Sequence, residues 1–180
     1  MVSVIDYRII GDAIKFYQND FEYIEVPWLI DIDTMMITAP YLSNVICVDQ
    51  IYPQCLVGSA EQSFLFLAKH NKLELNKKYM ACTPCFRNEN EDKLHQKYFM
   101  KVELFILSDS VNDLNFVINK SKEFFESYNK KIDIVKTIDG FDLEHNGIEL
   151  GSYGIRRYDN ISWVYGTGVA EPRFSNTISA

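Results

Sequence analysis

The chain has 180 residues, of which 47% are hydrophobic and 14% aromatic, and this composition excludes a disordered protein. No apolar run approaches the roughly 20 residues that a membrane-spanning helix needs, so the sequence does not predict an integral membrane protein. The formal net charge of −7 argues against a domain whose main task is to bind nucleic acid, since such domains are usually basic.

The first half of the chain predicts both helices and strands. Residues 5–17 place apolar side chains at helical spacing, and a strand over 23–26 then runs into Pro27. Ser59 and Gln62 have the spacing of a capping box, which predicts that a helix begins directly after Ser59.

The second half is richer in strands. Residues 79–89 and 98–107 predict an antiparallel hairpin whose tip is the polar loop 90–94. The clearest helix covers residues 111–128, where one stripe is apolar. Further strands are predicted at 132–137, 147–150 and 161–165. Strands joined mostly by hairpins, with helices between some of them, predict an α+β fold in which an antiparallel β-sheet is flanked by helices.

The predicted hairpin has one apolar and one polar face. Alternation along a strand puts Met100, Val102, Leu104 and Ile106 on the face toward the core. The other face carries charged side chains and one aromatic ring: Arg87, Glu89, Phe99, Lys101 and Glu103. Alternation alone favours a solvated sheet face with cross-strand ion pairs, each contributing about 0–1 kcal/mol.

The order of residues along the hairpin adds a second interpretation. Phe86-Arg87-Asn88-Glu89, followed by a loop, His95 and then Phe99, resembles motif 2 of the class II aminoacyl-tRNA synthetases. The resemblance implies that Arg87 holds the α-phosphate of ATP and the substrate carboxylate, and that Phe99 stacks on adenine. It also implies that Glu89 accepts from the adenine amino group and His95 contacts the outer phosphates. Without the resemblance, His95 would be interpreted as a solvated loop histidine.

Two other stretches extend the resemblance toward an ATP site. Residues 166–173 resemble motif 3, which implies that Arg173 binds the γ-phosphate. Residues 149–156 resemble the strand before motif 3 in the aspartyl and asparaginyl enzymes and in the ammonia-dependent asparagine synthetase of the same fold. This implies that Glu149 is a ligand of the Mg²⁺–ATP complex, and oxygen ligands are what Mg²⁺ prefers.

An amino-acid site is implied by residues 57–61. This stretch resembles the loop of Thr-x-Glu type in which a hydroxyl and a carboxylate hold the substrate amino group, here Ser59 and Glu61. The alternative is a plain helix cap, and both interpretations stay open. Lys101 and Glu103, on the polar face of the hairpin, are assigned to the same amino-acid site.

The cysteines are Cys47, Cys55, Cys82 and Cys85. Without a signal-peptide pattern, free thiols are expected. Cys82 and Cys85 have the C-x-x-C spacing of metal and redox sites, but residues three apart on a strand point to opposite faces. Buried, inert thiols are therefore favoured over a metal site.

The sequence as a whole predicts a class II synthetase-like catalytic domain over residues 1–180, with no anticodon-binding domain, located in the cytoplasm. Its predicted function is ATP- and Mg²⁺-dependent activation of an amino acid to an aminoacyl-adenylate, for transfer to tRNA or another acceptor. The alternatives are a non-catalytic relative that binds a nucleotide, an amino acid or a protein, and an RNA-binding protein without adenylation.

A homodimer is also expected. The helix and strand that run into Pro27 resemble motif 1, which implies a dimer interface. Residues 23–37 are rich in apolar side chains, among them Trp28, Leu29, Met35 and Met36. Exposed apolar surface of this kind usually marks an interface.

Overall fold

The structure is a computed structural model that describes residues 4–39, 41–48, 54–88, 90, 92 and 96–179. Its helices are α1 (Tyr7–Tyr17), α2 (Ile32–Met35), the 3-10 helix η1 (Leu42–Asn44), α3 (Ala60–Lys69), α4 (Val111–Glu126) and α5 (Arg173–Ile178). The strands are β1 (Glu22–Tyr23), β2 (Leu29–Asp31), β3 (Ile46–Cys47), β4 (Gln54–Leu56), β5 (Lys78–Phe86), β6 (Tyr98–Ile106), β7 (Asp133–Lys136), β8 (Phe141–His145), β9 (Ile148–Tyr158) and β10 (Ile161–Glu171).

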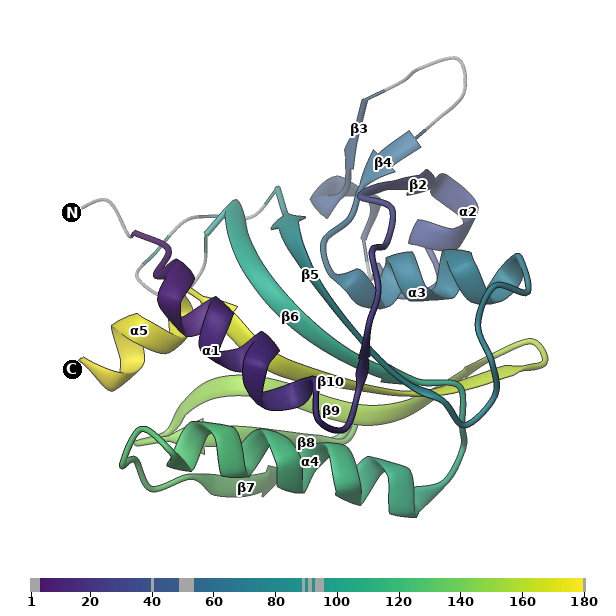
Figure 1. Cartoon of the computed structure of the whole chain (residues 1–180). Coiled ribbons are helices and arrows are strands. Elements are labelled where there is room, and N and C mark those ends of the chain that lie inside the picture. Colours follow the sequence, from purple (N-terminus) through teal and green to yellow (C-terminus); the bar gives the residue numbers. More distant parts are fainter. Residues whose placement is uncertain are drawn as a thin grey trace.

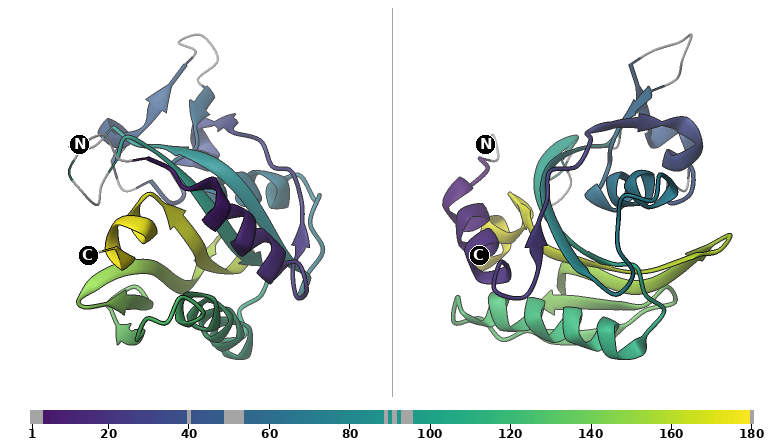
Figure 2. Two further views of the ribbon diagram at one scale, coloured as in Figure 1. Left: turned by 60° about the vertical axis from the view of Figure 1, so that its left-hand side comes forward. Right: turned by 45° about the vertical axis from the view of Figure 1, so that its right-hand side comes forward.

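Within the described residues, a seven-stranded sheet has the order β1-β5-β6-β10-β9-β8-β7, and a three-stranded sheet has the order β2-β4-β3. In the large sheet, β1 pairs with β5 in parallel and the other neighbours are antiparallel. Helices α1 and α4 cover one side of this curved sheet, and α3 lies on the other side (Figures 1 and 2). The predicted α+β class is therefore confirmed.

The hairpin of β5 and β6 confirms the predicted alternation. Its apolar side chains lie in one core cluster with residues of α1 and α4: Met80, Val102, Leu104 and Ile106. The opposite face is covered in part by α3, where Phe64 stacks on Phe105 with 4.8 Å between ring centroids. The polar face is therefore not an open, solvated surface, and its charged residues lie in a partly enclosed space.

The predicted helices begin where side chains can cap them. Asp6 accepts from the backbone of Arg8 at the start of α1, and Ser110 caps α4. The predicted capping box is present at α3. The Ser59 side chain accepts from the backbone at Gln62, and the Gln62 side chain accepts from the backbone of Ser59. Such caps satisfy backbone N–H groups that have no partner inside the helix.

Strands β9 and β10 are longer than the sequence predicts. Their glycines do not end the strands, because these positions have no room for a side chain. A Cβ atom on Gly166 would lie 2.5 Å from Val117 of α4 and 2.7 Å from the ring of Tyr153. A Cβ on Gly151 would lie 2.6 Å from the Thr167 side chain. Bare backbone at these places lets α4 and neighbouring side chains lie close to the sheet.

Several short elements were not predicted. The small sheet and α2 fall in a segment without clear periodicity, and no strand is predicted over the residues of β8. The strand expected at 23–26 is reduced to β1, and the hairpin strand expected to reach residue 89 ends at Phe86. Most of the predicted loop 90–94, together with Glu89 and His95, lies outside the described residues.

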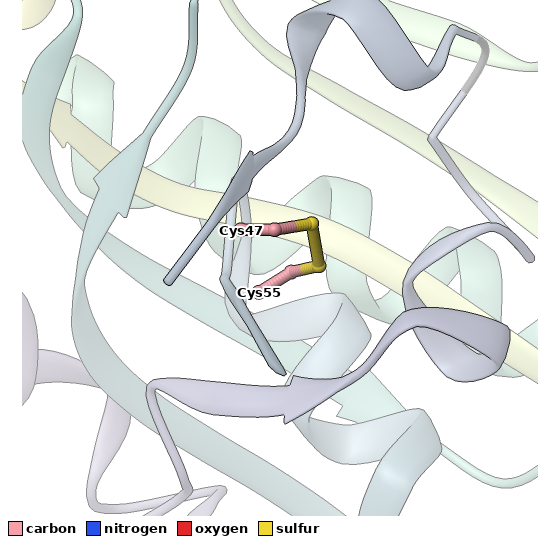
Figure 3. Close-up of a disulfide and its surroundings, with 2 residues drawn as sticks. All are labelled: Cys47 and Cys55. Atoms are coloured by element: carbon pink, nitrogen blue, oxygen red, sulfur yellow. A yellow bond between two sulfur atoms is a disulfide. The ribbon is translucent and has the colours of Figure 1, made fainter. Parts of the chain in front are cut away.

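The expectation of free thiols is wrong for two of the cysteines. Cys47 and Cys55 are joined by a disulfide, which links β3 to β4 (Figure 3). The two residues are direct cross-strand partners in the register of these strands, so their side chains are close enough to bond. Cys82 and Cys85 are free. Cys82 packs on the α1 and α4 side, whereas Cys85 lies beside Thr83 on the α3 side, as alternation predicts.

Among the described residues, none of the helices combines the length and the apolar character required to span a membrane.

The two free thiols should be unreactive in the native protein. Burial raises the pKa of Cys82 and of Cys85 to about 11, so about one thiol in a thousand is ionised at pH 8. A chromogenic disulfide reagent should titrate two thiols in denaturant without reductant, and four after reduction. Fast native reaction at pH 8, or four thiols without reductant, would contradict the structure.

The same shift has a consequence for stability. The folded state raises these pKa values above the usual 9.0. The contribution of the two thiols to the free energy of unfolding is therefore fully present below pH 9 and is lost as pH rises toward 11.

The contact of α3 with the sheet should be a major source of stability. Phe64 and Phe105 are both fully buried, so Phe64→Ala should lower the free energy of unfolding by about 3–5 kcal/mol. Urea denaturation followed by circular dichroism measures this. Ile138→Ala is the control, since Ile138 is fully exposed and its truncation should change stability by less than about 0.5 kcal/mol. Equal effects of the two substitutions would refute the proposed importance of this contact.

Candidate active site

A cavity of about 410 Å³ lies on the α3 side of the large sheet, a size typical of small-molecule sites. Most of the predicted site residues line it: Ser59, Glu61, Arg87, Phe99, Lys101, Glu149 and Arg173. Glu103 does not line it, because its side chain is completely buried beneath. The structure thus brings together side chains from α3, β6, β9, the start of α5 and the segment after β5.

Arg87 is oriented by the loop that precedes α3. Its Nε donates to the carbonyl oxygen of Gly58 at 3.1 Å, and its guanidinium carbon lies 5.1 Å from the ring centroid of Phe99. The adjacent Phe86 N–H donates to the carbonyl of Val57 at 2.9 Å, which fixes the loop to the end of β5. The predicted phosphate-binding arginine and the predicted adenine-stacking ring are therefore neighbours in the cavity.

Lys101 and Glu103 form an ion pair beneath the centre of the cavity. Lys101 Nζ lies 2.8 Å from Glu103 Oε2, and the same oxygen accepts from the Ser59 hydroxyl. The Glu103 side chain is 0% exposed and that of Lys101 is 12% exposed. A buried carboxylate needs such partners, because leaving it unpaired would cost several kcal/mol. Glu103 Oε1 has no hydrogen-bond partner among the described residues.

Glu61 is bound by two donors that the sequence did not indicate. Its carboxylate accepts from Arg156 Nη1 at 2.8 and 2.6 Å, and from Trp163 Nε1 at 2.7 Å. Burial raises the pKa of Glu61, while the charge of Arg156 opposes that shift. Burial also disfavours the charge on Arg156, but the charge and hydrogen bonds of Glu61, together with Tyr165 and Glu103, raise its pKa overall, so the guanidinium stays protonated.

Arg156 is the main cavity residue that sequence reasoning missed. It lies in the stretch 149–156 that resembles the strand before motif 3, in which only Glu149 is predicted to have a role. Alternation along β9 puts Arg156 on the same face as Ser152, and both line the cavity. This periodicity would have indicated Arg156 if β9 had been predicted at its full length.

The opposite end of the cavity carries Arg173 and Glu149, whose charged atoms are 3.0 Å apart. Arg173 begins α5, and Pro172 alone separates it from the end of β10. This turn is fixed by the buried Glu171, which accepts from the backbone and hydroxyl of Ser175 at 2.9 and 2.8 Å and from the Asp6 N–H at 3.1 Å. Burial raises the pKa of Glu171, and the hydrogen bonds from Ser175 oppose this.

The number of carboxylates in the site decides what kind of metal ion it could hold. Among the described residues there is no cluster of three or more histidine, cysteine, aspartate or glutamate side chains that could hold a metal by itself. Glu149 is a partly exposed carboxylate of the cavity lining, beside Arg173. That donor set fits Mg²⁺ carried by a nucleotide, because Mg²⁺ is usually held by one or two carboxylates together with phosphate oxygens and water.

Solved structures of several tRNA synthetases share this fold. Seryl-tRNA synthetase from Pyrococcus horikoshii, complexed with ATP, matches with a TM-score of 0.79 and 15% identity, covering 96% of this chain and 49% of that one. Cytoplasmic serine-tRNA ligase from Naegleria fowleri, in complex with AMP, matches with a TM-score of 0.77 and 20% identity. The match covers 95% of this chain and 52% of that one. Pyrrolysyl-tRNA synthetase from Desulfitobacterium hafniense matches with a TM-score of 0.72 and 16% identity. The match covers 89% of this chain and 65% of that one.

The chain therefore spans about half to two thirds of the length of these synthetases. At identities this low the likeness establishes the fold alone. No functionally curated protein matches the sequence.

The family comparison is more direct. Residues 59–178, two thirds of the chain, match the family described as the tRNA synthetases class II core domain (F). This segment contains α3 and the strands β5, β6, β9 and β10, which supply part of the cavity lining, whereas residues between Met35 and Gly58 supply the rest. By the sequence match and the shared fold, the chain belongs to the family of class II tRNA synthetase core domains.

Proposed function

We propose that this protein uses ATP to activate the carboxylate of an amino acid, giving an aminoacyl-adenylate and pyrophosphate. The observation that carries the proposal is the placement of Arg87, Phe99, Glu149 and Arg173 around one cavity. Two of the synthetases that share the fold are described in complex with ATP or AMP, which supports a nucleotide in this place.

The nucleotide would lie along the end of the cavity formed by β6 and α5. Adenine stacks on Phe99, Arg87 contacts the α-phosphate, and Arg173 contacts the γ-phosphate. The Arg173–Glu149 pair is partly exposed, and such pairs contribute only about 0–1 kcal/mol, so a phosphate can compete with Glu149 for Arg173. Mg²⁺, when bound, neutralises part of the triphosphate charge beside Glu149. The contacts that Glu89 and His95 would add lie outside the described residues.

The reaction needs positioning and charge stabilisation. A carboxylate oxygen of the amino acid attacks the α-phosphorus, the bond from that phosphorus to the oxygen bridging to the β-phosphate breaks, and pyrophosphate leaves with that oxygen. Arg87 stabilises the negative charge on the α-phosphate oxygens, because a guanidinium fork matches phosphate geometry. No side chain has to form a covalent bond with the substrate.

The amino acid would lie toward α3, among Ser59, Glu61, Lys101 and Glu103. Glu61 already accepts three hydrogen bonds, and a carboxylate has about four acceptor positions, so one position remains for a substrate ammonium group. Glu103 acts from beneath by holding Lys101 and Ser59 in place. The acceptor of the activated amino acid would be a tRNA or another nucleophile.

Arg87 provides the sharpest test of this function. Exchange of radiolabelled pyrophosphate into ATP, measured with each standard amino acid and Mg²⁺, should occur with one or a few of them. Arg87→Ala should lower that exchange by at least about 100-fold, because it removes the cation at the reacting phosphate. Thermal unfolding should show that the variant is folded. Arg157→Ala is the control, since Arg157 is exposed on β9 and should leave exchange unchanged.

Retention of exchange in Arg87→Ala would overturn the assignment of Arg87. If the unaltered protein binds ATP but shows no exchange with any amino acid, the function is that of a non-catalytic binding module.

We further propose a homodimer built on residues 23–37. Trp28 is 50% exposed, and Leu29 and Met36 are each 40% exposed. Met35, expected on the same surface, is instead 1% exposed and packs with Ile30 and Cys55 in a separate core. Exposed apolar side chains gathered in one segment are typical of an interface.

Sedimentation velocity at micromolar concentration should therefore show a dimer. Trp28→Glu should shift the protein to monomer, because a charge would be buried at the interface without a partner. Ile138→Glu, at an exposed position outside residues 23–37, should leave the dimer intact. A monomer in the unaltered protein would refute the proposal.

A further inference from the structure

Strand β10 contains a β-bulge beside the cavity. Thr167 and Val169 of β10 pair with the adjacent residues Glu103 and Val102 of β6. Gly168 is therefore an extra residue on β10, and a bulge of this kind bends its strand and changes the direction of the side chains that follow. Pairing with β9 has already ended before Thr167. Within the described residues, the end of β10 is thus paired with β6 alone.

The bulge changes which residues of β10 face the cavity. Before it, Tyr165 and Thr167 line the cavity. In an unbroken strand Val169 would follow them on the same side, because every second residue shares a face. Instead Val169 lies in the core cluster on the α1 and α4 side, and Ala170 lines the cavity. Arg173 comes three residues after Ala170, so its approach to the cavity depends on this change of alternation.

Two tyrosines donate hydrogen bonds to the backbone of the bulge. Tyr17 Oη donates to the carbonyl oxygen of Gly168 at 3.0 Å, and Tyr153 Oη donates to that of Thr167 at 2.6 Å. Both tyrosine side chains are fully buried. A bulge disrupts the hydrogen-bond ladder, and a buried carbonyl group without a donor is unfavourable because no water reaches it. The two hydroxyls therefore stabilise the bulged conformation of β10.

The two hydroxyls stay protonated, and the Tyr17 ring lies directly against the bulge. Burial raises the pKa of both tyrosines, and the nearby Ser121 hydroxyl only partly opposes this. A Cβ atom on Gly168 would lie 3.0 Å from the Tyr17 ring and 3.0 Å from the Val102 side chain. The bulged residue therefore has no room for a side chain.

Helix α1 holds the end of β10 at two points. Tyr17 is the last residue of α1 and binds the bulge, and Asp6 is the N-cap of the same helix. The Asp6 N–H donates to the Glu171 carboxylate at 3.1 Å, and Glu171 also accepts from Ser175 of α5. Helix α1 lies beside β10 (Figures 1 and 2). The stretch of β10 that leads to Arg173 is therefore fixed at both of its ends.

We propose that Tyr17 and Tyr153 are positioning residues for the γ-phosphate of ATP. By holding the bulge, they set the direction of β10 beyond Gly168 and thereby the place of Arg173 in the cavity. Both tyrosines belong to the core cluster on the α1 and α4 side, so they act through the backbone of β10 and do not touch the nucleotide. This inference rests on the proposed function in one respect, the assignment of Arg173 to the γ-phosphate.

The test compares the affinities for ATP and ADP, measured with Mg²⁺ by isothermal titration calorimetry. The two nucleotides differ only in the γ-phosphate, so the ratio of their affinities reports the contact at Arg173. Tyr17→Phe and Tyr153→Phe each remove one hydroxyl, and each should lower the preference for ATP at least about fivefold, because a displacement of about 1 Å can weaken such a contact severely. Thermal unfolding shows whether each variant is folded, and if one is not, the other decides.

Tyr79→Phe is the matched control. Tyr79 lies on β5 and is 4% exposed, and its hydroxyl accepts from the Glu74 N–H at 2.9 Å. This substitution also removes a buried tyrosine hydroxyl, but at a place remote from the bulge. It should lower the melting temperature and leave the ratio of the ATP and ADP affinities unchanged.

Arg173→Ala shows whether the tyrosines act through Arg173. Alone, this substitution should lower the preference for ATP over ADP at least about tenfold, because it removes a charge-assisted contact with phosphate. In the Arg173→Ala background, Tyr17→Phe should change the ratio by less than about twofold, since the contact that it displaces is already absent. A purely structural role of Tyr17 would instead lower the affinities for ATP and ADP equally.

The outcomes separate the inference from the function on which it rests. If Arg173→Ala lowers the preference for ATP and neither tyrosine variant does, the inference is wrong and the proposed function stands. An equal fall of the ratio in Tyr79→Phe, or equal affinities for ATP and ADP in the unaltered protein, would also overturn the inference. A fall that depends on Arg173, in a protein without ATP–pyrophosphate exchange, would support the inference and refute the proposed function. Neither nucleotide binding nor exchange would refute both.

Discussion

The burial of charge between the large sheet and α3 is the constraint on which the cavity depends. Lys101 and Arg156 lie on different strands, and each is paired with a carboxylate that is almost completely buried. Removing one partner of such a pair typically costs about 3–5 kcal/mol, because the remaining charge has no water to solvate it. The two pairs therefore fix the floor and the far end of the cavity before any ligand enters.

The first turn of α3 is the junction that connects these pairs. Ser59 caps the helix and donates to Glu103 of β6, and Glu61 in the same turn binds Arg156 of β9. One residue earlier, the Gly58 carbonyl accepts from Arg87 after β5. A short segment thus orients side chains from three separate parts of the sheet. The helix-cap and the substrate-loop interpretations of Ser59 are compatible, since the cap is what places the hydroxyl at the cavity.

Features that depend on residues close together in the sequence could be predicted, whereas features that depend on distant residues could not. The hairpin of β5 and β6 and the capped starts of the helices were predicted because alternation and capping spacing are local sequence patterns. The length of β9 and β10 was underestimated because the space that requires Gly151 and Gly166 is created by residues of other elements. The small sheet has strands of two or three residues, too short to show a period.

The same reasoning applies to the cavity. Motif resemblance indicated Arg87, Phe99, Glu149 and Arg173, and the fold brings them around one space. The Arg156–Glu61 contact joins residues 95 positions apart, and no spacing rule relates such positions. The Cys47–Cys55 bond and the burial of Glu103 likewise depend on which strand or helix lies opposite, and that is a property of the assembled fold.

The cations of the cavity differ in the partners they have in the described part of the chain. Lys101, Arg156 and Arg173 each face a carboxylate, whereas Arg87 contacts an aromatic ring and a carbonyl oxygen. A neutral partner offsets less charge than a carboxylate does, so Arg87 retains the strongest attraction for an incoming anion. Affinity for phosphate should therefore arise at Arg87.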